Sequence, residues 1–315
     1  MKIAMMGTGG VGGVFGARLA ESGEDVSFIA RGSNLKAIKE NGLLVVSDKT
    51  HELLIKPAKV TADPSEVGPV DYIFLSVKLW DTEAVAPILK PMIGENTAII
   101  SLQNGIGKDG VLQKLYHQKN VVGGVAYVAA FIMRPGVIEQ RGTRQKLVFG
   151  EFTRVQSERL LRLKDACKRA NINSVVSDDI ERDLWEKFIV LIAMSAVTAA
   201  TRTTIGTVRS EPLSRELLLE AMHEAAAIAN AKNIKVSDDI VERQMDYLDS
   251  LAPEVSSSMH HDIEQGNRLE LPWLSGTVVQ LGKELGIPTP ANKALAGVLM
   301  PHAMGRQCQS PVKST

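Results

Sequence analysis

The residues from Gly7 to Gly12 place three glycines in the spacing G-x-G-x-x-G, directly after a short apolar run, Ile3–Met6. In this pattern one glycine makes a tight turn, the next lets the backbone approach a diphosphate, and the third lets a helix pack on a strand. The N-terminus of the following helix attracts the phosphates through its N–H groups and dipole. We therefore expect a dinucleotide site rather than a glycine-rich turn without a ligand. Its residues are Gly7, Thr8, Gly9, Gly10, Val11 and Gly12.

The end of the second apolar run indicates which dinucleotide is bound. In NAD sites an acidic residue about 20 residues further on binds the ribose 2′-hydroxyl. Here the run Val26–Ala30 ends at Arg31, and Asp25 stands at the wrong end of the run to reach the ribose. A guanidinium is always charged and offers several donors to a 2′-phosphate. Arg31 therefore favours NADP, with a surface arginine at a strand end as the alternative, while Arg18 is expected to be a solvated charge.

Apolar runs alternate with helical segments in the first half of the chain, which predicts a parallel sheet with helices on both faces. The expected strands are Ile3–Met6, Val26–Ala30, Tyr72–Ser76, Ala98–Leu102 and Val121–Val125. The expected helices are Val14–Ser22, Asn34–Asn41, Thr82–Lys90, Gly110–His117 and Ser157–Ala170. Strands are also expected at Val137–Gln140 and Lys146–Gly150, as a hairpin around Arg141-Gly142, and at Ser174–Val176.

After about Asp178 the segments are helical and strand patterns cease. The expected helices are Ile180–Thr201, Pro212–Lys232, Ser237–Leu251, Ser258–Gln265, Leu274–Leu285 and Asn292–Leu299. The longest apolar run, Phe188–Ala200, is shorter than the ~20 residues of a membrane span, so we expect a buried helix. The fold class is thus α/β, with a Rossmann-type domain at residues 1–178, an all-α domain at 179–304 and a polar tail at 305–315.

The composition limits the class of partner. The 36 basic and 36 acidic residues balance, so the net charge offers no attraction to nucleic acid or to an anionic membrane. Cys167 and Cys308 stand far apart in no metal or redox spacing, as is typical of the reducing cytosol. His260 and His261 diverge on a helix and lack a third ligand, so no metal site is expected. We expect a cytoplasmic protein with neither nucleic acid nor membrane as a partner.

Four further segments, together with the glycines, resemble the ketopantoate reductase (2-dehydropantoate 2-reductase) family from about Met1 to Met300. They are Leu75-Ser76-Val77-Lys78, Leu102–Gly107, Asp183–Lys187, and Ser257–Asp262 followed by Glu270. The resemblance implies a Rossmann domain, then a helical domain like that of 6-phosphogluconate dehydrogenase, with the active site in the cleft. It also implies an oxidoreductase acting on CH–OH, which reduces the ketone of ketopantoate to (R)-pantoate with NADPH in pantothenate and coenzyme A biosynthesis.

The resemblance assigns catalysis to Lys187 and Glu270, both of which also contact the substrate, and binding of the substrate carboxylate to Ser258. Lys187 precedes an apolar run, where desolvation would lower the pKa of its ammonium and suit it to acid catalysis. Position alone would make Lys187 a surface lysine, or one of a Glu186–Lys187 pair that solvates a helix end. Glu270 would be a surface glutamate, and Glu264 competes with it on spacing.

Other assignments have structural alternatives as well. Ser258 by itself would cap the helix that follows it. Lys78 and Asn104 each follow a strand, and the resemblance places both near the cofactor, with Asn104 able to bind substrate too. From the residues alone, Lys78 is a strand-end lysine and Asn104 forms an Asx-turn before Gly105.

One departure concerns the substrate. In close relatives, asparagines lie one and two helical turns after the catalytic lysine, and here Leu191 and Ser195 occupy those positions. All three share one helix face. Ser195 can still bind substrate and Leu191 cannot, so a different, more apolar 2-oxo acid is an alternative. A non-catalytic dinucleotide sensor is an alternative of another class. The apolar helical domain is compatible with a homodimer.

Overall fold

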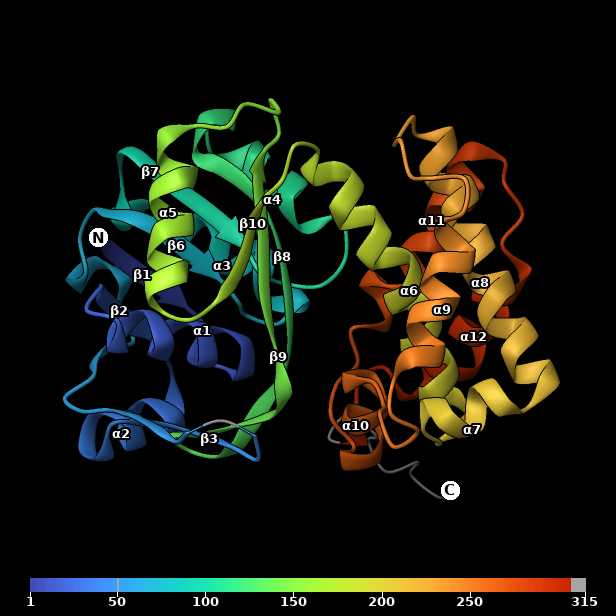
Figure 1. The fold of residues 1–315 in the computed structure, drawn as a ribbon, viewed down its shortest axis with the longest axis horizontal. Helices are drawn as coiled ribbons and strands as arrows, with labels where there is room; N and C mark the ends of the chain where they lie inside the picture. The colour runs from blue at the N-terminus through green and yellow to red at the C-terminus, as the bar shows by residue number, and fades with distance from the viewer. Residues whose placement is uncertain (50, 307–315) are drawn as a thin grey trace, which may run out of the picture. The chain divides into compact units, whose positions relative to one another are not determined.

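The structure is a computed structural model that describes residues 1–49 and 51–306 (Figure 1). Contacts between residues divide the chain into two units, Met1–Leu184 and Trp185–Thr315. The division falls within the first helix of the C-terminal half, a few residues after the boundary that we placed at residue 178. Cys308 and nearly all of the predicted polar tail lie outside the described residues.

The first unit contains a ten-stranded mixed sheet in the order β4-β3-β9-β8-β7-β6-β1-β2-β5, with β10 paired to β9. The strands are β1 Lys2–Met6, β2 Asp25–Ile29, β3 Leu43–Ser47, β4 Leu53–Ile55, β5 Lys59–Thr61, β6 Val70–Leu75, β7 Ile93–Ser101, β8 Val121–Arg134, β9 Val137–Glu151 and β10 Asn173–Val176. Neighbours from β8 to β5 in this order run parallel, as predicted. The pairs β8·β9 and β3·β4 are antiparallel, which makes the sheet mixed.

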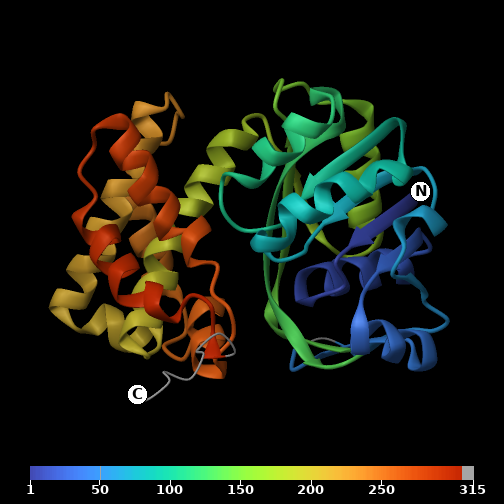
Figure 2. The same ribbon diagram turned by 180° about the vertical axis from the view of Figure 1, so that it is seen from behind.

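Helices cover both faces of this sheet. They are α1 Gly10–Glu21, α2 Gly32–Asn41, α3 Thr82–Val85 with a 3-10 helix at Ala86–Met92, α4 Lys108–Leu115 and α5 Glu158–Arg169. Figure 1 shows α1 and α5 in front of the sheet, and the view from behind in Figure 2 shows the cyan-to-teal helices of residues 82–115 on the opposite face. The predicted Rossmann-type arrangement is therefore present.

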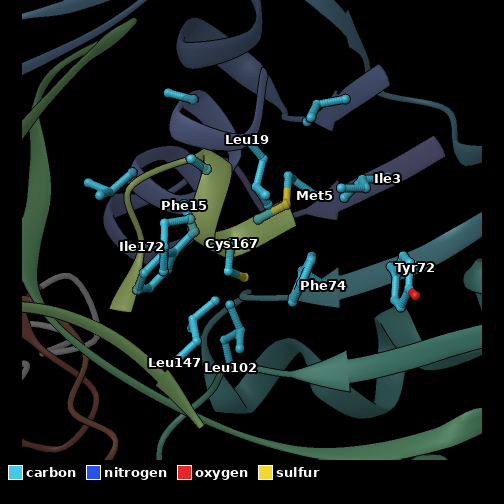
Figure 3. Packing of buried hydrophobic residues seen from close by; sticks show 14 of the residues in the cluster. Ile3, Met5, Phe15, Leu19, Tyr72, Phe74, Leu102, Leu147, Cys167 and Ile172 are labelled. Carbon is cyan, nitrogen blue, oxygen red and sulfur yellow. The ribbon is translucent and has the colours of Figure 1, made fainter. Parts of the chain in front are cut away.

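Alternate residues of β1 enter two separate apolar cores. Ile3 and Met5 are fully buried with Phe15 of α1, Phe74 of β6 and Cys167 of α5 (Figure 3). The residues between and after them on β1 belong to the second core, with side chains of α3, the following 3-10 helix and α4. Because a strand presents successive side chains to opposite faces, this alternation shows that β1 is covered on both sides.

Two expectations about this unit are wrong. Arg18, expected to be solvated, is buried, and its Nη2 donates to Gln140 Oε1 over 3.3 Å. The hairpin does not turn at Arg141-Gly142. Strand β9 continues through these residues, and the chain turns at Gly136, where φ is +77°. The pairing with β8 skips residues 142–144. Gly142 therefore lies in a β-bulge and not in a hairpin turn.

The second unit is helical, as predicted. Its helices are α6 Ile180–Thr201, α7 Ile205–Ser210, α8 Pro212–Ala231, α9 Ile240–Ser250, α10 Ser258–Gln265, α11 Ser275–Leu285 and α12 Pro290–Leu299. Helix α6 begins at the end of the first unit. It is long and apolar enough to cross a membrane, but 67% of its most apolar window is buried inside the structure. The expectation of a buried helix is confirmed.

Candidate functional site

Four segments that we predicted to bind the cofactor follow four neighbouring strands. The glycine loop, defined as residues 7–12, follows β1, while Arg31 follows β2, Lys78 follows β6 and Asn104 follows β7. These strands are adjacent and parallel in the order β7-β6-β1-β2, so their carboxyl ends share one edge of the sheet. Nucleotides bind at this edge in open α/β sheets.

The glycine loop is held by hydrogen bonds from both neighbouring strands. The N–H groups of Gly7 and Thr8 donate to the carbonyl of Ile29 over 3.2 and 3.1 Å. On the other side, Ser76 Oγ donates to the carbonyl of Gly7 over 2.7 Å. Asn34 Nδ2 donates to the carbonyl of Thr8 over 2.9 Å, and its Oδ1 accepts from the turn between β8 and β9. The backbone of the loop is thus fixed by its surroundings.

The space around each glycine decides whether the loop fits a diphosphate. Gly7 has φ +101°, in the left-handed region that favours glycine. A Cβ at Gly10 would overlap the carbonyl oxygen of Ala130, and a Cβ at Gly12 would overlap that of Gly7. At Gly9, by contrast, a Cβ would meet no heavy atom of the described residues within 4 Å. Gly9 is the N-cap of α1, so this open space adjoins the N–H groups of the first helical turn. The loop therefore fits a diphosphate.

Lys78 and Asn104 occupy turns at neighbouring strand ends. The Lys78 side chain is exposed, with its ammonium 5.6 Å from the centre of the Trp80 ring. Asn104 is partly buried in a turn in which Gly105 has φ +79°. Both turns lie on the edge that carries the glycine loop, which is the placement expected for residues that contact a bound dinucleotide.

Gln103, which sequence reasoning did not single out, joins these two turns. Its Nε2 donates to the carbonyl of Val77 over 2.9 Å and lies 2.7 Å from Thr82 Oγ1. Its Oε1 accepts from Ser101 Oγ over 2.9 Å. Gln103 is buried and directly precedes Asn104, so it fixes the Asn104 turn against the Lys78 turn. Its only signal in the sequence is a polar residue at the end of an apolar strand.

A buried ion pair closes the other side of the Asn104 turn. The Lys108 ammonium is fully buried and lies 2.9 Å from the Asp109 carboxylate. It also donates to the carbonyls of Ser101 over 3.0 Å and Gly124 over 3.3 Å. Burial raises the pKa of the Asp109 carboxyl, which the Lys108 charge opposes. Lys108 thereby links the end of β7 to Gly124, near the start of β8.

In the second unit, Lys187 lies on α6 between aromatic residues. Trp185 and Phe188 are buried and contact each other edge to face, with ring centres 5.6 Å apart. Lys187 itself is partly exposed. Leu191 and Ser195 follow at four-residue intervals and share its face of the helix, with Ser195 buried. That the Lys187 ammonium meets an apolar wall stays a prediction.

The neighbouring glutamate joins α6 to another helix. The Glu186 carboxylate pairs with Arg243 Nη2 of α9 at 3.0 Å. This contact fixes the Lys187 segment of α6 to α9.

The capping interpretation of Ser258 is wrong, because the N-cap of α10 is Ser257. Ser257 Oγ accepts from the N–H of His260 over 3.1 Å and lies 2.8 Å from Thr198 Oγ1 of α6. Ser258 is the first residue of the helix and is exposed. Thr198 is about three helical turns beyond Lys187, on the same side of α6. The start of α10 is therefore fixed to the α6 face that carries Lys187.

Glu270 lies in the connection between α10 and α11, at the start of the short 3-10 helix Leu271–Trp273. The residues on either side, Leu269 and Leu271, are buried, while Glu270 is partly exposed. The N–H of Leu269 also donates to the carbonyl of Ala303 over 2.9 Å. The backbone at Glu270 is thus fixed by its apolar neighbours.

The competitor Glu264 occupies a different environment on α10. Its carboxylate is half-exposed and lies 3.2 Å from His260 Nε2. His260 is buried, and its Nδ1 bonds with the hydroxyl of Ser256. Among residues 1–49 and 51–306, no group of three or more His, Cys, Asp or Glu side chains is placed to hold a metal ion.

A Rossmann-type edge with a loop that fits a diphosphate, followed in the chain by a helical unit, is the arrangement of a dinucleotide-binding protein. Residues 3–154 match the family "Ketopantoate reductase PanE/ApbA", and residues 179–303 match "Ketopantoate reductase PanE/ApbA C terminal". The chain belongs to this family, as the sequence resemblance implied. It is an oxidoreductase that acts on the CH–OH group of a small molecule.

Individual relatives match along nearly the whole chain. A 2-dehydropantoate 2-reductase of Mesorhizobium japonicum is 28% identical over 332 residues, which cover 98% of this chain and 100% of the relative. A PanE/ApbA family ketopantoate reductase from Ralstonia eutropha JMP134 has a crystal structure with TM-score 0.87 and 30% identity, covering 96% of this chain and 98% of that one. A D-mandelate dehydrogenase with NADH and anilino(oxo)acetate has TM-score 0.87 at 22% identity, over 96% of this chain and 98% of that one, and here the likeness concerns the fold alone.

Gly9 offers a test of the loop. The substitution Gly9→Val should abolish dinucleotide binding, because the side chain would fill the open space in front of α1, and the melting temperature should stay within a few degrees of wild type. Gly10→Ala, at a crowded position of the same loop, serves as a comparison for stability. Its Cβ overlaps the Ala130 carbonyl, so it should lower the free energy of unfolding by about 1–3 kcal/mol. Fluorescence titration and thermal melting measure the two effects, and normal nucleotide binding by Gly9→Val would contradict the assignment.

The adjacent serines of α10 give a second test. Ser257→Ala removes the cap and the contact with Thr198, so it should lower the free energy of unfolding by about 1 kcal/mol. Ser258→Ala removes an exposed hydroxyl that caps nothing and should change it by less than about 0.5 kcal/mol. Urea denaturation of both variants measures the difference. Equal losses would show that the helix is capped differently.

Proposed function

We propose that the protein reduces the ketone of 2-dehydropantoate (ketopantoate) to (R)-pantoate with NADPH, a step of pantothenate and coenzyme A biosynthesis in the cytoplasm. The observation that carries this proposal is the joint presence of Lys187, Ser258 and Glu270 in a chain that matches both parts of the family. The sensor alternative gives no reason for all three to be present.

The cofactor assignment rests on the strand-end residues of the first unit. The glycine loop would hold the diphosphate with backbone N–H groups, and Arg31 would hold a 2′-phosphate. We assign Lys78 and Asn104 to the same cofactor, with Asn104 also reaching substrate. When bound, the nicotinamide ring supplies the hydride.

The helical unit would supply the proton and the grip on the substrate. Negative charge builds on the carbonyl oxygen during reduction, and the Lys187 ammonium would stabilise that charge and donate a proton from Nζ. Ser258, at the positive end of the α10 dipole, would bind the substrate carboxylate. Glu270 would orient the substrate hydroxyl or Lys187 itself, and Ser195 would add a polar contact.

Leu191 favours one alternative, a reductase for a more apolar 2-oxo acid. It lies one turn after Lys187 on the same helix face, where close relatives carry a hydrogen-bonding residue. A methyl-rich side chain in that position would leave a polar substrate group unpaired and would suit an apolar one. The reaction type is the same in both cases.

Steady-state turnover tests the proposal. Ketopantoate and a panel of 2-oxo acids with apolar side chains should be assayed with NADPH and with NADH. We expect the highest kcat/KM for ketopantoate with NADPH. A higher kcat/KM for an apolar 2-oxo acid would show that ketopantoate is not the preferred substrate, and the enzyme class would stay the same. Nucleotide binding without turnover of any acid would favour the sensor.

Arg31→Ala tests the cofactor. Loss of a charge-assisted contact to phosphate costs about 1.5–3 kcal/mol, so the affinity for NADPH should fall roughly 10- to 100-fold. The affinity for NADH should change little, because its ribose carries no phosphate there. Fluorescence titration with both nucleotides measures this. An equal loss for both would exclude a 2′-phosphate role.

Lys187→Ala tests the mechanism. General acid catalysis contributes about 10²–10⁴-fold, so kcat should fall at least about a hundredfold while NADPH binding persists. The pH profile of kcat should lose its basic limb, which we attribute to deprotonation of Lys187. Glu270→Ala should lower the rate and keep that limb if Glu270 only orients substrate. Near-normal turnover by a folded Lys187→Ala enzyme would remove this lysine from the mechanism and make Lys78 the next candidate.

A further inference from the structure

Arg31, the residue assigned to the 2′-phosphate, is already bound to a carboxylate. Its Nη2 lies 2.7 Å from Asp81 Oδ2. The two residues are far apart in the sequence, and they follow β2 and β6, which flank β1 on either side. Strands two positions apart in a sheet are separated by about 10 Å. The ion pair therefore bridges the carboxyl end of β1, where the glycine loop begins.

The two partners differ in how firmly they are held. The Arg31 side chain is 82% exposed, whereas that of Asp81 is 23% exposed. Asp81 ends the 3-10 helix Leu79–Asp81, and its N–H donates to the carbonyl of Lys78 over 2.9 Å. The next residue, Thr82, is buried and contacts Gln103. Asp81 is thus presented by a packed turn, and the long arginine is the partner that can move.

This arrangement makes two anions compete for one guanidinium. A 2′-phosphate that binds Arg31 must displace the Asp81 carboxylate or accept it as a close neighbour of like charge. A ribose 2′-hydroxyl carries no charge and meets neither penalty. The ion pair between Arg31 and Asp81 therefore weakens the binding of NADPH and leaves the binding of NADH unaffected.

We propose that Asp81 is a specificity-determining residue that restrains Arg31 and thereby lowers the preference of this enzyme for NADPH over NADH. The inference rests on the proposed function, in which Arg31 binds the 2′-phosphate. It adds a residue on the opposite side of the glycine loop that sets how strongly Arg31 discriminates. Asp81 acts through Arg31 and is a positioning residue.

The test measures dissociation constants for NADPH and NADH by fluorescence titration of the full chain. Asp81→Asn keeps the size of the side chain and removes its charge. It should tighten NADPH binding roughly three- to tenfold and leave NADH within about twofold, because an exposed ion pair is weak but the phosphate carries more than one charge. No change in the NADPH affinity would overturn the proposal.

A matched control separates this effect from net charge. Asp25 pairs with Lys59 at 2.5 Å, at the start of β2 and so at the opposite edge of the sheet. Asp25→Asn makes the same change in charge and should leave both dissociation constants unchanged. If it tightens NADPH as much as Asp81→Asn does, the proposal fails, because the effect then arises from overall charge.

The double variant tests the route of action. In an Arg31→Ala background, Asp81→Asn should have no further effect on NADPH, since the group that Asp81 restrains is gone. If Asp81→Asn still tightens NADPH binding in this background, Asp81 does not act by restraining Arg31. Its charge would then repel the phosphate directly. If Arg31→Ala alone weakens both nucleotides equally, the 2′-phosphate assignment itself fails. If Arg31→Ala weakens only NADPH and Asp81→Asn leaves the NADPH affinity unchanged, the 2′-phosphate assignment holds and the role of Asp81 fails.

Discussion

The parallel strands β2, β1, β6 and β7 bury apolar side chains on both faces of the sheet, which leaves only their ends available to a polar ligand. Strand β1 shows this most directly, because its successive side chains enter two different cores. A diphosphate cannot approach through either face, and the open space in front of the N–H groups at the start of α1 lies at the strand end. The positions of the glycine loop, Arg31, Lys78 and Asn104 all follow from this constraint.

Buried polar groups then hold that edge in shape. Gln103 links the turns after β6 and β7, and Lys108 links the end of β7 to the first residues of β8. Both side chains are buried, so leaving their donors unsatisfied would cost stability. Each therefore makes one arrangement of the turns favourable over others. Arg31 and Lys78 are exposed and Asn104 is partly buried, whereas the two side chains that hold this edge are buried.

Local spacing was enough to predict the parts of the fold with strong patterns. Long periodic segments such as α6, α8 and the five apolar strands were predicted correctly in type. Strands β4 and β5 were missed because three residues cannot establish a period, and the five-residue strand β3 was missed as well. The hairpin was misplaced because Arg141-Gly142 has the composition of a turn, whereas a glycine is equally required in a bulge, and pairing with a strand far along the chain decides between them.

In the candidate site, too, local sequence patterns do not predict contacts between residues that are far apart in the chain. The glycine loop is recognisable because its chemistry is local, whereas the pairing of Arg31 with Asp81 depends on the order of strands in the sheet. Adjacent serines, Ser257 and Ser258, offer the same hydroxyl to the start of α10, and the contact with Thr198 decides which one caps it. Each unit therefore positions its own residues through internal contacts, those around Gln103 in the first and those around Ser257 in the second.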